Sequence, residues 1–185
     1  MSKGVRTGLI GGAIIALIYI VLLWIKFTFL SYSPFVFYLS NFVSYLLIIC
    51  CFVFLALQHR RALGGYAEIK DLFQPIFIAI LFAELAYFIF TFVYLNYVKP
   101  NFFEGYEQAM IAFAHEREMP KEALDKQVEM VRGQAEASRD FWLLFKGVLL
   151  RWIVVDSIFG IIIAFLLRKR TPQQLMDSVL KKQQF

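Results

Sequence analysis

The chain has 185 residues, of which 60% are apolar and 18% are charged, and its formal net charge is +5. Soluble domains are roughly 45–50% apolar, so this chain has too little polar surface to cover its apolar residues in water. The composition therefore excludes an ordinary soluble domain and predicts a single integral membrane domain over residues 1–185.

Four apolar segments are each long enough to cross a bilayer. About 20 apolar residues in a helix span the hydrocarbon layer of roughly 30 Å, and a helix is required because lipid cannot satisfy backbone polar groups. In chain order, the predicted spans cover residues 7–25, 35–57, 73–97 and 147–167. The predicted fold class is an all-α integral membrane four-helix bundle with an extracytoplasmic helical insertion between spans 3 and 4.

Small residues recur every four positions along the first span, at Gly4, Gly8, Gly12 and Ala16. Such a stripe lets two helix backbones approach closely. One interpretation is the seam of a homodimer. The other is packing against a helix of the same chain, which the presence of four spans favours.

The connection between the second and third spans, residues 58–71, contains a Gly64-Gly65 turn. Apolar residues beyond this turn share one helical face and predict a short interfacial helix that leads into the third span. These residues are Tyr66, Ile69, Leu72 and Phe73.

The connection over residues 98–140 is too long for a bare loop and predicts a helical insertion. An early amphipathic piece is followed by Pro120, which suits the first turn of a helix. Apolar residues then recur at helical spacing, so we expect helix over much of Pro120–Arg139. The pattern is also compatible with this helix continuing directly into the fourth span.

Basic residues predict the orientation. The amino terminus, residues 58–71 and the tail 168–185 together hold 10 Lys or Arg residues and three acids, whereas residues 98–140 hold six basic residues and nine acids. Since Lys and Arg concentrate on the cytoplasmic side, we expect both termini to be cytoplasmic. The insertion and the short connection over residues 26–34 then face outward. The basic tail suits anionic lipid better than nucleic acid.

Ionisable residues inside the spans are the candidates for function. An ionisable group at the bilayer centre costs about 2.5–3.5 kcal/mol, and Glu84, Arg151 and Asp156 lie within the third and fourth spans. We expect Glu84 and Arg151 to face the bundle interior and to share one polar network with Asp156. The network would be either a proton or cation site or a structural interhelical contact.

Motifs for enzymatic chemistry are missing from the sequence. It contains no paired intramembrane histidines, Cys-x-x-Cys pair, metal-ligand cluster, phosphate-binding glycine loop or serine elbow. The sequence therefore predicts no enzymatic activity, no cofactor and no metal.

The chain resembles a family of uncharacterised bacterial membrane proteins, domain of unknown function 4199, common in Bacteroidota. The resemblance rests on four hydrophobic segments and a charged helical insertion, together with three local motifs. These are Gly64-Gly65-Tyr66, Ile69-Lys70-Asp71-Leu72-Phe73, and Asn96 to Glu104. It implies a multi-pass protein of the bacterial inner (cytoplasmic) membrane and supplies no activity or catalytic residue.

Two functions fit these observations. The first is a non-catalytic accessory or interaction subunit of the inner membrane, which contacts the lipid bilayer and a membrane-protein partner or a second copy of itself. The alternative is a small proton- or ion-coupled transporter that uses Glu84, Asp156 and Arg151 and acts as a dimer because four spans are few for transport.

The orientation can be tested with single introduced cysteines. A membrane-impermeant thiol reagent should label positions within Glu116–Glu136 from outside intact cells. Positions within Arg60–Lys70 should be labelled only after permeabilisation. The reverse pattern of labelling would contradict the orientation that the basic residues predict.

Overall fold

The computed structural model describes residues 2–169, which form helices and no strand. The predicted tail 168–185 lies, from residue 170 onward, outside the described residues. Four stretches are long and apolar enough to cross a membrane, which confirms the predicted helical membrane bundle. They comprise α1 (Lys3–Phe29), α2 (Pro34–Ala62), α3 (Ile69–Val93) with the π-helical turn η1 (Tyr94–Val98), and a composite fourth stretch of α6 (Phe141–Leu144), η2 (Phe145–Leu150, π-helical) and α7 (Arg151–Leu167).

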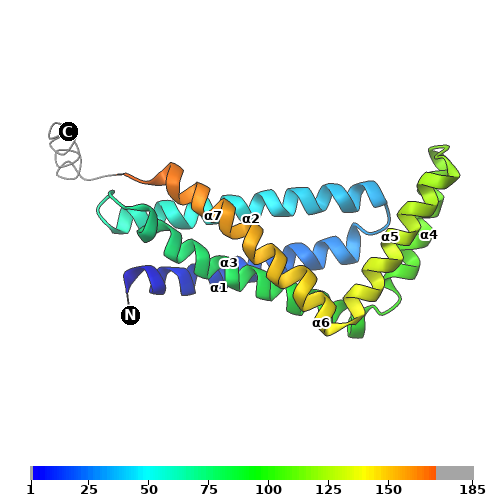
Figure 1. Ribbon diagram of the computed structural model, residues 1–185, viewed down its shortest axis with the longest axis horizontal. Coiled ribbons are helices and arrows are strands. Elements are labelled where there is room, and N and C mark those ends of the chain that lie inside the picture. Colours follow the sequence, from blue (N-terminus) through cyan, green and yellow to red (C-terminus); the bar gives the residue numbers. More distant parts are fainter. Residues whose placement is uncertain (1, 170–185) are drawn as a thin grey trace, which may run out of the picture.

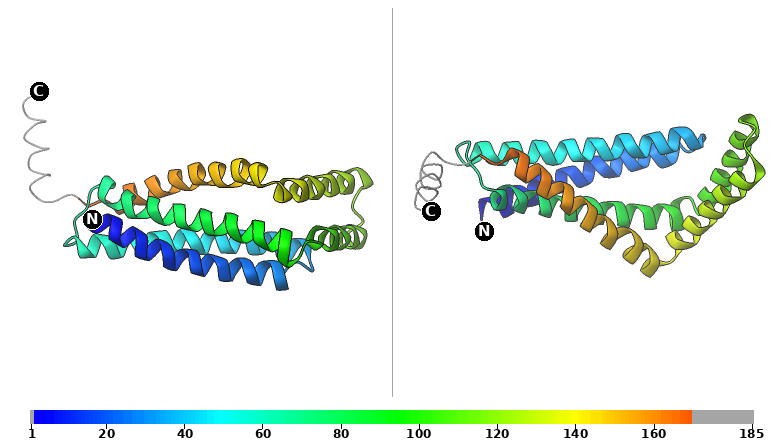
Figure 2. Two further views of the ribbon diagram at one scale, coloured as in Figure 1. Left: turned by 90° about the horizontal axis from the view of Figure 1, so that it is seen from below. Right: turned by 45° about the horizontal axis from the view of Figure 1, so that its top comes forward.

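The four long stretches run side by side, with α3 between α1 and α7. The amino terminus and the α2–α3 turn lie at one end of the bundle (Figure 1). The α1–α2 connection lies at the opposite end, where α4 (Phe102–Glu116) and α5 (Lys121–Arg139) form a hairpin inclined steeply to the bundle (Figures 1 and 2). The long connection over residues 98–140 is therefore the helical insertion that its sequence predicts.

The small-residue stripe of α1 lies against α3. Gly4, Gly8 and Gly12 are buried, and Ala16 is partly buried. A Cβ atom added at Gly8 would lie 2.9 Å from the Cβ of Ile78 and 3.0 Å from the Cα of Pro75. Only glycine permits this approach of the two backbones, so the stripe fixes the distance between α1 and α3.

The start of α3 differs from its sequence-based expectation. Instead of a separate interfacial helix, α3 begins at Ile69 and continues without a break to Val93. Glu68 and Asp71 form a capping box, in which the backbone N–H of Glu68 donates to the Asp71 carboxylate at 3.1 Å. This cap satisfies free N–H groups of the first turn, so the apolar residues after the glycine turn extend the third span.

The α4–α5 hairpin is held together by one ion pair and by apolar packing. Arg132 on α5 donates to the Glu107 carboxylate on α4 at 2.6 and 3.1 Å. This hydrogen bond holds the pKa of Glu107 below its ordinary value. On the side of the hairpin that faces the bundle, Tyr106, Met110 and Val131 are buried against the ends of α1 and α3 nearest the hairpin.

A break at Asp140 corrects the expectation of one continuous helix from the insertion into the fourth span. Asp140 has an extended backbone (φ −88°, ψ 118°), and its carboxylate accepts from the backbone N–H groups of Trp142 and Leu143 at 2.7 and 2.9 Å. It is thus the N-cap of α6. The chain can change direction here, which allows the hairpin to be inclined to the bundle.

Replacing Gly8 with Ala should lower the free energy of unfolding by about 1–3 kcal/mol, because the added methyl group must push α1 away from α3. Denaturant titration of the protein in detergent micelles measures the change. The matched control is Gly133→Ala on α5, where nothing lies within 4 Å of the added Cβ. That variant should gain about 0.5–1 kcal/mol. Equal effects of the two substitutions would contradict the close approach.

Candidate functional site: a carboxyl pair between α3 and α7

Glu84 on α3 and Asp156 on α7 are both turned into the bundle, where only 5% and 3% of their surfaces are exposed. Helical spacing places each on the interior face of its helix. Glu84 follows the fully buried Ile80 by four residues, and Asp156 precedes the buried Gly160 by four. Both carboxyl groups are therefore far from the lipid-facing surface.

The two carboxyl groups lie close enough to interact electrostatically with each other. In addition, the Tyr45 hydroxyl on α2 donates to Asp156 Oδ1 at 2.7 Å. Two unit charges about 4 Å apart would repel by about 4 kcal/mol at an effective dielectric constant of about 20. The geometry thus favours a pair that shares one proton.

Tyrosines surround the pair on its other sides. Tyr19 on α1 and Tyr87 on α3 stack with ring centroids 5.7 Å apart, and both lie near enough to Glu84 for an electrostatic interaction. Together these residues form the carboxyl cluster, to which each of the four spanning stretches contributes. Its members are Tyr19, Tyr45, Glu84, Tyr87 and Asp156.

The Tyr45 side chain is positioned by the aromatic residues of α7. Its ring centroid lies 6.1 Å from that of Trp152 and 6.1 Å from that of Phe159, which are one helical turn to either side of Asp156. This packing aims the hydroxyl at the carboxylate between them, so a single side chain ties α2 to α7 by both apolar packing and a hydrogen bond.

Arg151 does not join the carboxyl cluster. Its side chain is exposed, and within residues 2–169 it forms no salt bridge with Glu84 or Asp156. Five residues separate it from Asp156, about 500° around the helix axis, which puts the two on different sides of α7. A long Arg side chain can snorkel toward the membrane surface. The expected three-residue network is therefore corrected to Glu84 and Asp156 with their tyrosines.

Sequence reasoning missed the tyrosines and one buried lysine. Tyr45 lies in the middle of the second predicted span, whereas membrane tyrosines prefer the interface. This unusual depth is the feature of the sequence that could have indicated Tyr45 as a site residue. Lys26, expected in the first connection, is buried in the last turn of α1. Its ammonium group donates to Asn41 and lies 4.6 and 4.4 Å from the ring centroids of Phe27 and Phe37.

Within the described part of the chain, no group of three or more His, Cys, Asp or Glu side chains is placed to hold a metal ion.

Comparison with protein families gives one match. The family model described as "Protein of unknown function (DUF4199)" covers residues 6–169. The chain belongs to this family. No curated protein and no solved structure matches the chain. Membership of DUF4199 agrees with the family resemblance of the sequence, and the carboxyl cluster lies wholly within the matched residues.

Proposed function

We propose that this DUF4199 member is a non-catalytic accessory or interaction subunit of a bacterial inner (cytoplasmic) membrane, and that it binds a partner through the α4–α5 hairpin. The observation that carries the proposal is the hairpin's position beyond the end of the bundle (Figure 1). The distribution of basic residues supports cytoplasmic termini and a hairpin on the outer side.

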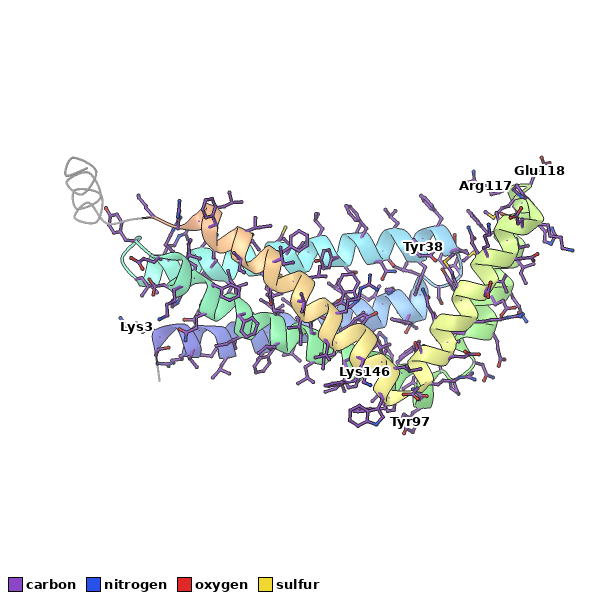
Figure 3. All side chains as sticks on the ribbon, viewed as in Figure 1. Lys3, Tyr38, Tyr97, Arg117, Glu118 and Lys146 are labelled. Atoms are coloured by element: carbon purple, nitrogen blue, oxygen red, sulfur yellow. The ribbon has the colours of Figure 1, made fainter. Side chains whose placement is uncertain are left out.

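The hairpin combines a fixed base with an exposed outer surface. Aromatic packing fixes the base, where the ring centroids of Phe27 and Phe102 are 5.1 Å apart. In contrast, Arg117 and Glu118 lie at its exposed tip, far from the bundle (Figure 3). A rigid helical pair with an exposed polar surface can bind a partner without the loss of conformational entropy that ordering a flexible segment would cost.

Charge reversal on the exposed side of α5 tests the docking role. Asp125→Lys combined with Glu129→Lys should reduce by at least about tenfold the recovery of a partner that copurifies with the wild type in mild detergent. Quantitative mass spectrometry measures the recovery. The control variant, Leu46→Ile with Ile162→Leu on the lipid-facing surface, should retain the partner. A partner retained equally by both variants would contradict docking through α5.

A second candidate, proton- or ion-coupled transport, is favoured by one observation, the buried contact between Glu84 and Asp156. Ionisable residues inside a membrane protein often mark proton relays. The exposed Arg151 leaves two carboxyl groups to carry this function. Dimerisation remains part of this candidate, and the stripe Gly4–Ala16 is not available as its seam because α3 covers it.

The transport candidate predicts a pH-driven flux. Liposomes that contain the protein and a pH-sensitive dye should acidify faster than empty liposomes when a proton gradient is applied. Glu84→Gln and Asp156→Asn should each abolish this difference, because an amide cannot exchange the proton that a carboxyl group carries. Asp125→Asn on the exposed hairpin is the matched control. A wild-type rate equal to that of empty liposomes would exclude proton transport through the cluster.

A further inference from the structure

The carboxyl pair lies at the contact between two particular helices, α3 and α7. On α7, Gly160 brings the helix close to α3, since an added Cβ would lie 3.1 Å from side-chain atoms of both Ile76 and Ile80. Glu84 and Asp156 lie one turn further toward the outer side. The pair therefore lies beside the packing contact between these two helices.

Within residues 2–169, no Lys or Arg side chain forms a salt bridge with either member of the pair. The groups that face it are Tyr19 from α1, Tyr45 from α2 and Tyr87 from α3, and each of them is a neutral phenol near pH 7. The two cations nearest along α7 and η2, Arg151 and Lys146, have exposed side chains. Loss of the shared proton would thus leave two negative charges close together, with no cation from residues 2–169 paired to them.

The two helices that carry the pair are also the two that hold the hairpin. The outer end of α3 passes through η1 into α4, and α5 passes through α6 and η2 into α7. Asn96 of η1 donates to the backbone carbonyl of Ser138 near the end of α5, at 3.2 Å. Movement of α7 away from α3 would therefore reach the hairpin through these two junctions.

Both junctions are π-helical turns, η1 after α3 and η2 before α7. Single π-helical turns are rare and occur frequently at functional sites. Here they place a local irregularity between each helix of the pair and the hairpin. An irregular turn can absorb a change in direction that a regular helix resists.

We propose that the Glu84–Asp156 pair is a proton-controlled switch, in which one shared proton holds α7 against α3 and its loss separates the two helices and shifts the α4–α5 hairpin. The switch is intramolecular and does not depend on the proposed docking role. At low pH the proton bridges the carboxyl groups, and at high pH their mutual repulsion drives the helices apart.

Two pairs of spin labels in the full-length protein in lipid nanodiscs test this. The native Cys50 and Cys51 are first replaced with Ala. Cysteines at the exposed positions Ile89 and Val154 report the distance between α3 and α7, and cysteines at Phe35 and Met130 report the distance between α2 and the hairpin.

We expect both distances to change by at least about 2 Å, the size of typical switching shifts of helices, between about pH 5 and about pH 9. Glu84→Gln, whose amide cannot lose a proton, should remove both changes. If Glu84→Gln does not fold, Asp156→Asn provides the same test. Asp125→Asn on the hairpin should leave both changes intact.

Constant wild-type distances across this pH range would overturn the proposal, and this result needs no variant. A change in the first distance without the second would overturn the coupling to the hairpin. A full response in folded Glu84→Gln would show that another group drives the movement. Because no partner is present in the nanodiscs, failure of the docking proposal cannot produce any of these results.

Discussion

The close approach of α1 to α3 is the constraint on which the rest of the bundle depends. Gly8 and Gly12 bring the backbone of α1 within van der Waals range of Pro75 and Ala79. Gly160 brings α7 close to α3 on another side, against Ile76 and Ile80. Helix α3 therefore packs closely against small residues of α1 and α7 on two sides. A polar side chain on its interior face must find its partners inside the bundle.

Glu84 is that side chain, and its environment argues for more than packing. A carboxyl group at this depth carries an insertion cost of about 2.5–3.5 kcal/mol, and Asp156 adds a second cost of the same kind. Apolar side chains of similar volume generally replace buried polar pairs without loss of stability. The hydrogen bond that Tyr45 donates to Asp156 offsets part of the cost, but it does not explain why acids occupy these positions.

The sequence predicted the elements of this fold and only part of the site. Hydropathy located the four spans, but it marks only the apolar residues that fit the hydrocarbon layer. It therefore missed that helix α1 extends beyond them, from Lys3 to Phe29. The N-cap at Asp140 interrupted an expected helix, because the periodicity of apolar residues persists across a change in direction. Local patterns of this kind contain no information about the angle between successive helices.

The same distinction explains the site residues. Depth in the membrane follows from counting residues, which placed Glu84 and Asp156 at a similar level. Rotation about the helix axis depends on which faces pack, and the glycines of α1 and α7 decide this. Arg151 is at a suitable depth on an outward-facing side of α7, whereas Tyr45 reaches Asp156 because Trp152 and Phe159 hold its ring.

The two helices of the hairpin, α4 and α5, are attached to the bundle differently, and this difference would decide which of them follows a shift of α7. Helix α4 rests on an aromatic base, where Phe102 and Tyr106 pack against Phe27 and Phe37 beside the buried Lys26. Helix α5 is joined to the fourth spanning stretch at the extended backbone of Asp140. A shift of α7 would thus act on α5 at this joint while α4 stays seated, so a charge change deep in the bundle would alter the hairpin's exposed side first.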